Sequence, residues 1–362
     1  MRSVQLVPLA LLSLVSWVAA SPPPQLPRIA GAAAVCPITR VVDGDTLWVR
    51  RGEKEEKLRL LCVDTEETIK KGPSDPSKPQ TVFGDETMHW ARALFGGLDA
   101  ADGQADGVTH IGLAFPGGLE KRDSFGRLLC HVLLPDGEDY NLRLVREGWS
   151  PYFNKYGNSD LAHAAFVAAQ REAREAKRGV WNPATNRPAE TGAPTVQRAY
   201  DELLPWWDAR ATAIGAFQAR VAQREEGLFD AEDPASIAAA QAWSEKHARP
   251  ATLFGSFEAH HVEADGSHTL VFRGPDKKLL LRATVSAGAW AGLAALDLEA
   301  RVSGKVQNYV YVRGQPQPHE RGGAALRADQ PEQWQIAAPD YRAPDAARPA
   351  TAGALKPVPV GG

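Results

Sequence analysis

The stretch VVDGDTLWV, residues 41–49, decides the first half of the fold. Apolar residues stand on both sides of Asp43-Gly44, and an Asp-Gly pair between alternating apolar residues is a strong signal for a two-stranded hairpin. The stretch therefore predicts strands over 38–42 and 47–50, joined by a tight turn at Asp43-Gly44.

Further strands and helices are expected on the C-terminal side of this hairpin. Alternating apolar patterns predict strands over 57–63, 108–115 and 128–134. Apolar residues at helical spacing predict helices over 85–95, 140–147 and 161–178. Five short strands with helices inserted or appended predict a mainly β fold with α (α+β), a five-stranded barrel of the oligonucleotide-binding type (OB fold) with three helices.

The second half of the chain predicts a separate unit. A helical tendency over 196–248 is interrupted at Pro205 and Pro234, and strand-rich sequence after it predicts a second small OB-like β domain. Its strands are expected over 252–259, 269–273, 279–285, 298–306 and 310–313. The expected division is a signal peptide at 1–20, a linker at 21–34, the first barrel at 35–182, a linker at 183–195, a helical spacer at 196–248, the OB-like domain at 249–339 and a disordered tail at 340–362.

Composition excludes several classes of protein. With 44% hydrophobic and 23% charged residues, the chain is typical of a folded globular protein and unlike collagen, a coiled coil or a wholly disordered chain. The 41 basic and 44 acidic side chains give a net charge of -3, which argues against binding nucleic acid by bulk positive charge. Any nucleic-acid chemistry must therefore depend on a local site.

The N-terminus is typical of a secretory signal peptide. Arg2 precedes an apolar run at 6–20, and the small residues at 18–20 form a cleavage site before Ser21. We expect export to the periplasm or the cell exterior, and the alternative is an uncleaved anchor. No second apolar run of spanning length follows, so no membrane span is expected in the mature chain.

Acidic and basic residues suited to phosphodiester cleavage flank the third expected strand. Asp45 lies at the hairpin, Asp64 and Glu67 follow the strand that carries Arg59, and Arg127 begins a later strand. Carboxylate and carbonyl oxygens suit calcium, a glutamate near the metal can activate water, and arginines can hold a phosphate as charge develops. Taken singly, each of these is an ordinary surface acid, loop residue or exposed strand residue.

The order and spacing of these residues resemble the staphylococcal nuclease (thermonuclease) family over residues 35–181. The matching segments are VVDGDTLWV, LRLLCVDTEET, FGDETMHWA, RDSFGRLL, NLRLVREGW and AKRGVW. The resemblance implies an OB barrel that hydrolyses DNA and RNA, in single-stranded or flexible regions, to 3′-phosphate products. It also implies a role for each site residue: Asp45, Asp64 and the carbonyl of Thr65 bind Ca²⁺, Glu67 is the general base or orients water, and Arg59 and Arg127 hold the phosphate.

Some positions depart from the family pattern. Glu66 stands where the family often has proline, and it adds a negative charge beside the metal. Ser124 and Phe125 replace a Lys-Tyr pair, so Phe125 keeps a ring for stacking while the grip on a terminal phosphate is weakened. Tyr152 and Tyr156 fall where the family places base-stacking tyrosines.

Near the C-terminus, VSGKVQNYVYVRGQPQ at 302–317 resembles, more weakly, OB-type nucleic-acid-binding strands. Tyr309, Tyr311 and Arg313 share one face of the expected strand, and Val310 and Val312 share the other. With the valines toward the core, the two rings and the guanidinium would form an outward strip that binds single-stranded nucleic acid. An ordinary amphipathic strand explains the pattern equally well.

These features favour a secreted or periplasmic Ca²⁺-dependent nuclease. The alternatives are a non-catalytic nucleic-acid-binding module and an envelope interaction module on the same fold. Such silent versions should lose an arginine or the base first, because those residues have no packing role, and all of them are present here. The sequence does not identify a protein partner.

The chain has three cysteines, too few for a disulfide scaffold. In the fold that the resemblance implies, the strands carrying Cys62 and Cys130 are parallel neighbours, with the two cysteines at one level. A disulfide between them is one expectation. The other is three separate buried thiols that behave as small apolar residues.

Overall fold

The computed structural model describes residues 28–70, 78–96, 110–123, 125–186, 198–274, 278–302, 305–320 and 322–344. The predicted signal peptide, residues 21–27 of the first linker, residues 187–195 of the second linker and most of the C-terminal tail lie outside these ranges. Within them, we find no helix that is both long enough and apolar enough to cross a membrane.

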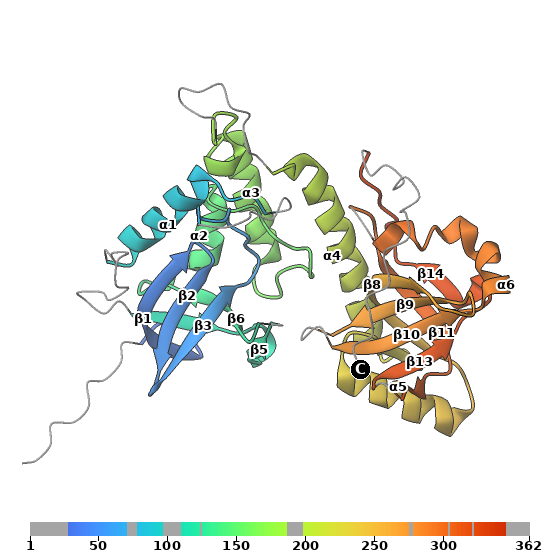
Figure 1. The fold of residues 1–362 in the computed structure, drawn as a ribbon. Helices are drawn as coiled ribbons and strands as arrows, with labels where there is room; N and C mark the ends of the chain where they lie inside the picture. Colours follow the sequence, from blue (N-terminus) through green and yellow to red (C-terminus); the bar gives the residue numbers. More distant parts are fainter. Residues whose placement is uncertain are drawn as a thin grey trace, which may run out of the picture.

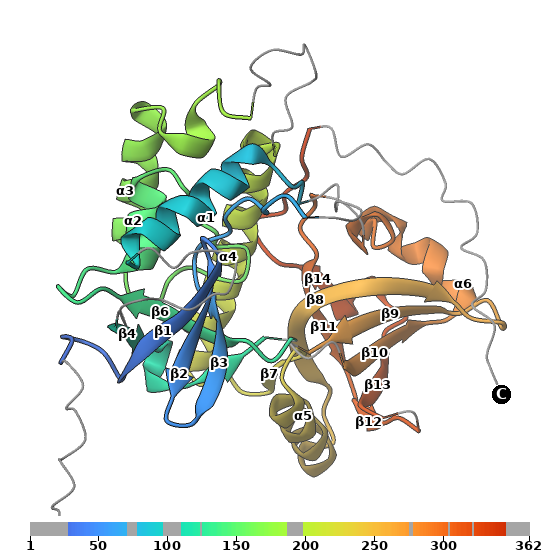
Figure 2. The ribbon, with the colours of Figure 1, turned by 60° about the vertical axis from the view of Figure 1, so that its left-hand side comes forward.

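Five strands close the first unit into a barrel, as the sequence predicts (Figures 1 and 2). The sheet runs in the order β3-β2-β1-β4-β6, and β6 pairs again with β3, in parallel, which closes the barrel. Short β5 pairs with the start of β6. The strands are β1 (Ala34–Asp43), β2 (Thr46–Arg51), β3 (Lys54–Leu60), β4 (His110–Ala114), β5 (Lys121–Arg122) and β6 (Leu128–Leu133).

The first hairpin turns one residue later than the predicted Asp43-Gly44, because Asp43 still belongs to β1. Asp43 of β1 lies opposite Thr46 of β2, so the turn falls at Gly44-Asp45. Leu47 and Val49, two residues apart on β2, are completely buried in the barrel core. The acidic residues therefore stand where the barrel strands end, outside the apolar core.

Three helices complete this unit: α1 (Val82–Leu94), α2 (Tyr140–Arg146) and α3 (His163–Glu175), as predicted. Thr81 and Asp139 cap α1 and α2 by accepting hydrogen bonds from backbone N–H groups of the first turn. The three helices gather at one end of the barrel (Figures 1 and 2), and Tyr140 and Phe166 from them are completely buried.

Two longer helices follow the barrel. α4 (Tyr200–Ala222) continues through Pro205, so the interruption predicted there is wrong. Pro205 is exposed and lies near the helix start, where the loss of one intrahelical hydrogen bond on the solvent side is tolerated. α5 (Pro234–His247) begins at Pro234, with Asp233 as its N-cap, in agreement with the break expected at that proline.

The second unit is built on a curved sheet in the order β12-β13-β10-β9-β8-β11-β14, with β7 paired to β8. The first half of β8 pairs with β11 and its second half with β9. Its description as OB-like stays a prediction. The strands are β7 (Leu228–Asp230), β8 (Ala251–Val262), β9 (His268–Arg273), β10 (Leu279–Val285), β11 (Tyr309–Gly314), β12 (Gln317–Pro318), β13 (Ala324–Arg327) and β14 (Trp334–Ile336).

The strand predicted over 298–306 is wrong. The backbone there folds around Arg301, which is 5% exposed and donates hydrogen bonds to the carbonyls of Leu296 and Gln307. A buried guanidinium needs such partners, and an extended strand could not supply them. Short helical segments in the described chain are α6 (Ala287–Trp290) and 3₁₀ turns at Pro116–Gly118, Gly179–Trp181, Ala291–Leu296, Ala300–Val302 and Pro331–Gln333.

α4 lies between the barrel and the second sheet (Figure 1). Trp207 is 1% exposed, and its ring packs edge-on against Phe153 of the barrel with ring centroids 4.7 Å apart. Trp206 Nε1 donates to the carbonyl of Val306 in the second unit at 2.9 Å. Both tryptophans therefore pack at the junction between the two units.

The Cys62–Cys130 disulfide is not formed, because all three cysteines are free. β3 and β6 are parallel neighbours as expected, but Leu60, and not Cys62, lies opposite Cys130. Cys62 comes two residues later, beyond the end of β3, so the two thiols are not at one level. The three thiols are separate, as the other expectation has it, and Cys36 and Cys130 are buried, whereas Cys62 is only partly buried.

Candidate functional site

Two loops bring the acidic residues of the barrel together. One is the hairpin turn with Asp43 and Asp45, and the other, residues 64–67, follows β3. Asp45 Oδ2 accepts a hydrogen bond from the backbone N of Thr65 at 2.9 Å, and Asp43 Oδ1 accepts one from the backbone N of Asp45 at 3.1 Å. These bonds tie the two loops into one acidic cluster.

Arg59 joins the two metal-ligand candidates of this cluster. Its guanidinium donates to Asp64 Oδ1 at 2.7 Å and forms a second ion pair with Asp45 Oδ1. Asp45 is 2% exposed and Asp64 is completely buried, so both carboxylates need a cationic partner. Burial alone would lower the pKa of Arg59, but the two carboxylates outweigh it and hold that pKa above its ordinary value.

Asp64 has two further cationic partners. Lys78 Nζ lies 2.5 Å from Oδ1, and an Arg198 Nη atom lies 2.9 Å from Oδ2. Burial would raise the pKa of Asp64, but the charges of Lys78, Arg59 and Arg198 hold it well below its usual range. In contrast, burial and the neighbouring Asp45 carboxylate raise the pKa of Asp43 to about 7.

Glu67 occupies the same loop, and its side chain is 34% exposed, which leaves it accessible to water. Its backbone carbonyl accepts a hydrogen bond from the N of Thr81, just before α1, at 3.0 Å. A Cβ on Gly84 would lie 2.1 Å from that carbonyl oxygen, so only glycine lets the first turn of α1 approach so closely. The helix start thereby positions the loop that carries Glu67.

Arg127 lies one residue before β6, the strand that pairs with β3, which carries Arg59. Leu129 is opposite Arg59, and Arg127 is two residues before Leu129, so the side chains of both arginines lie on one side of the β3–β6 pair. Arg127 Nε donates to Asp123 Oδ2 at 2.6 Å, and its guanidinium stands 5.4 Å from the centre of the Phe125 ring. The structure thus brings Asp45, Arg59, Asp64 and Thr65 into contact, with Glu67 and Arg127 beside them on adjoining elements.

The predicted substrate-binding residues of the barrel have different environments. Phe125 is 72% exposed and Tyr156 is 69% exposed, as stacking on a base requires. The expectation for Tyr152 is wrong, because its ring is 2% exposed and stacks on Phe166 at 5.0 Å. Its hydroxyl is also bonded to His163 Nδ1 at 2.9 Å, so Tyr152 has a packing role.

The outward aromatic strip expected on β11 is also wrong. Tyr309 is 4% and Tyr311 is 7% exposed, and both pack on Phe254 with ring centroids 5.0 and 4.9 Å apart. β11 lies between β8 and β14, and α4 covers the tyrosine face through Phe217, so both strand faces are buried. Arg313 alone of the three residues is exposed.

Sequence reasoning missed several partners of the acidic loop. Glu66 is buried and accepts hydrogen bonds from Thr81 Oγ1 at 2.5 Å, Asn186 Nδ2 at 2.7 Å and the Tyr200 hydroxyl at 3.4 Å. Its carboxylate therefore joins the loop to residues that follow the barrel. Lys78 and Arg198 were likewise unforeseen, because nothing in the spacing near either residue indicates that it folds back onto Asp64.

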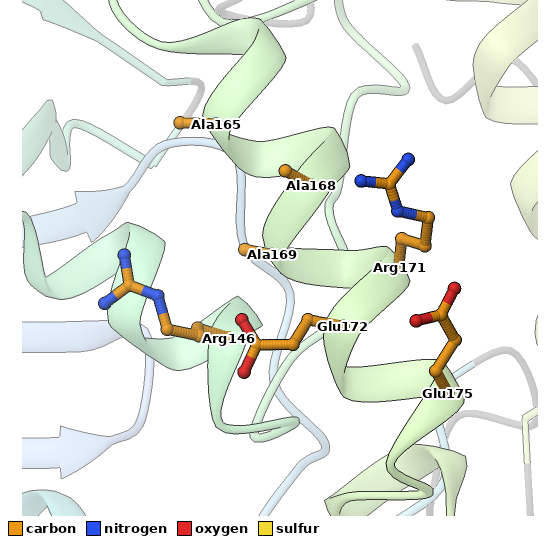
Figure 3. A pocket seen from close by; sticks show the side chains of 7 residues that line it. All are labelled: Arg146, Ala165, Ala168, Ala169, Arg171, Glu172 and Glu175. Atoms are coloured by element: carbon orange, nitrogen blue, oxygen red, sulfur yellow. The ribbon is translucent and has the colours of Figure 1, made fainter.

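A second surface feature takes no part in this site. Figure 3 shows a pocket between α2 and α3, lined by alanines and by Arg146, Arg171, Glu172 and Glu175. None of the acidic cluster lines it. Over the described residues, no group of three or more His, Cys, Asp or Glu side chains is arranged to hold a metal ion.

Comparison with known proteins places the site in a family context. The family described as "Staphylococcal nuclease homologue" matches residues 57–183. An uncharacterized endonuclease of Escherichia coli O157:H7 is 31% identical over 147 residues, covering 41% of this chain and 76% of that protein. A thermonuclease of Staphylococcus intermedius is 28% identical over 144 residues, covering 40% and 74%.

A much larger relative matches over a similar length. Endonuclease YhcR of Bacillus subtilis is 30% identical over 147 residues, which are 40% of this chain. The matched part of the chain spans only 11% of the length of that endonuclease. The family match at residues 57–183 begins within β3 and ends before α4 and the second sheet.

Proposed function

The chain belongs to the staphylococcal nuclease family, and we propose that it is a nuclease that hydrolyses phosphodiester bonds of DNA, RNA or both to 3′-phosphate products. The observation that carries the proposal is Arg59, which bridges Asp45 and Asp64 beside Glu67. The nuclease names of two relatives that are covered over about three quarters of their length support it.

The cation of the reaction is proposed to be Ca²⁺. Asp45, Asp64 and the backbone carbonyl of Thr65 would hold it, and these hard oxygen donors are of the kind that calcium prefers. Their fit is supported by the geometry of the donors, since a hydrogen bond holds Asp45 against the Thr65 backbone and Arg59 holds Asp45 and Asp64 side by side. When bound, the ion supplies positive charge that polarises the phosphate.

Side chains of the chain itself have the other roles in cleavage. Glu67 is accessible to water, so its carboxylate can accept a proton from the attacking water molecule. Arg59 and Arg127 project on one side of their strand pair, where two guanidinium groups can hold the non-bridging oxygens of one phosphate. Phe125, exposed beside Arg127, offers a ring on which a base can stack.

The place of action is proposed to be outside the cytoplasm, in the periplasm or the medium. The support is the N-terminal sequence alone, in which Arg2 precedes an apolar run and small residues before Ser21. Mass spectrometry of the mature protein would show Ser21 as the first residue if this is correct.

The proposal is tested by the products of cleavage. The chain is incubated with 5′-labelled single-stranded DNA and RNA, in millimolar Ca²⁺ or in excess chelator. We expect cleavage in Ca²⁺ only, and products that a polymerase cannot extend until a phosphatase has removed the 3′-phosphate. Products with a free 3′-hydroxyl would contradict the proposed chemistry, and intact substrate in Ca²⁺ would contradict the nuclease itself.

A further inference from the structure

A segment from outside the family match reaches the acidic loop. Arg198 and Tyr200, at the start of α4, follow the end of the matched stretch at residue 183. Arg198 donates to Asp64 Oδ2 at 2.9 Å, and the Tyr200 hydroxyl donates to Glu66 Oε1 at 3.4 Å. The start of α4 therefore contacts the very loop that supplies the proposed cation ligands.

Arg198 is held at Asp64 by α4. Its side chain is 7% exposed, and the guanidinium lies 5.5 Å from the centre of the Tyr200 ring and 5.9 Å from that of Trp207. Its Nε is buried and has no hydrogen-bond partner among the described residues. The guanidinium therefore depends on Asp64 and the two rings, and docking of α4 determines its position.

Three cationic side chains form ion pairs with the two carboxylate oxygens of Asp64. Arg59 and Lys78 share Oδ1, and Arg198 is paired with Oδ2. Arg59 is fixed on a barrel strand and also bridges to Asp45, whereas Arg198 enters from another element. A cation bound to Asp64 would repel the guanidinium at Oδ2 and compete with it for that oxygen.

We propose that Arg198, paired with Asp64 Oδ2, is a built-in competitor of the cation at Asp64 and is displaced when the cation binds. The inference rests on the proposed function, because it takes Asp64 as a cation ligand. Competition at one carboxylate is reciprocal: if docking of the α4 start weakens cation binding, the cation weakens that docking by the same factor. The nuclease site and the second unit are thereby coupled through α4.

The test compares Ca²⁺ binding to the wild type, to Arg198→Gln and to two controls by isothermal titration calorimetry. Without the competing guanidinium, we expect Arg198→Gln to bind Ca²⁺ at least roughly 5-fold more tightly, the lower end of typical coupling between sites. Arg220→Gln removes the same charge from α4 at an ion pair with Glu225, and it should bind as the wild type does. Tyr200→Phe removes the bond to Glu66 at constant charge and should tighten binding to a smaller extent.

Hydrogen exchange supplies a readout that a general charge effect would not move. Adding Ca²⁺ to the wild type should increase deuterium uptake in a peptide that covers residues 198–204, because the α4 start is released. Equal Ca²⁺ affinity in the wild type and Arg198→Gln, or unchanged uptake over 198–204, would overturn the inference while leaving the nuclease proposal intact. Absence of Ca²⁺ binding in both proteins would overturn the inference together with the proposed calcium site.

Discussion

Arg59 and Arg127 are the same residue type with different partners. The Arg59 side chain is 14% exposed and neutralises two carboxylates that are 3% and 0% exposed, whereas the Arg127 side chain is 22% exposed and is paired with the single carboxylate of Asp123, which is 18% exposed. Removing one partner of a buried ion pair leaves an uncompensated charge, which costs far more than the loss of a pair near the surface. The two arginines should therefore share a role in cleavage and differ in their effect on stability.

We expect Arg59→Gln to lower the free energy of unfolding by about 3–5 kcal/mol, because Asp45 and Asp64 lose their common partner. Arg127→Gln should lower it by only about 1 kcal/mol or less. Both variants should lose cleavage. Urea unfolding in the absence of Ca²⁺ measures the first effect, and equal stability losses in the two variants would contradict the account.

At this scale the sequence predicts part of the site. Asp45, Arg59 and Asp64 lie close along one hairpin and the strand after it, so family spacing locates them. Lys78 and Arg198 are 14 and 134 residues from Asp64 in sequence, and only tertiary packing brings their charges to it. The burial of Tyr152 likewise depends on Phe166 of α3 and not on its own neighbours in sequence.

At the scale of elements, the start of α1 supports the loop that carries Glu67 through backbone contact. Gly84 is the critical position, since its missing Cβ leaves room for the Glu67 carbonyl. The existence and order of the barrel strands and helices were predictable, because apolar periodicity fixes them locally. The missing strand at 298–306 and the continuity of α4 through Pro205 were not predictable. Both depend on tertiary packing, which buries Arg301 and leaves Pro205 on the exposed side of its helix.

Gly84→Ala should lower stability by about 1–3 kcal/mol, because the new methyl group overpacks a backbone carbonyl that cannot move aside. It should also reduce cleavage, since the loop that holds Glu67 must shift. Gly215→Ala is the matched control on α4, where an added Cβ meets nothing within 4 Å and helix propensity favours alanine by about 1 kcal/mol. Thermal unfolding of both variants checks this, and a neutral Gly84→Ala would be at odds with the proposed support of the loop.

At the scale of the whole molecule, α4 connects the barrel to the second sheet, and Lys155 lies at that junction. Its Nζ stands 4.8 Å from the centre of the Trp206 ring, and its backbone carbonyl accepts a hydrogen bond from Arg210 at 3.1 Å. Burial and the charge of Arg210 lower the pKa of Lys155 to about 8. The interface therefore favours the neutral, deprotonated form of Lys155.

This lowered pKa makes stability depend on pH. Between the folded value of about 8 and the ordinary value of 10.5, the unfolded chain binds more protons at Lys155 than the folded chain does, so its contribution to stability rises with pH. Lys155→Met should be more stable than the wild type at pH 7 and lose most of that advantage by pH 10.5. Thermal melts across this range test the prediction, with Lys54→Met on the exposed end of β3 as the control that should follow the wild type.

If the cluster of Asp45, Arg59 and Asp64 works with Glu67 as a phosphodiester-cleaving site, removing the basicity of Glu67 must slow cleavage. The turnover of Glu67→Gln in saturating Ca²⁺ measures this, because the change keeps the size and hydrogen bonding of the side chain. Glu175→Gln, on the exposed side of α3, is the matched control. We expect Glu67→Gln to cleave single-stranded DNA about 10²–10⁴-fold more slowly than the wild type and Glu175→Gln to be unaffected. Cleavage by Glu67→Gln at the wild-type rate would show that Glu67 is not the base of this site.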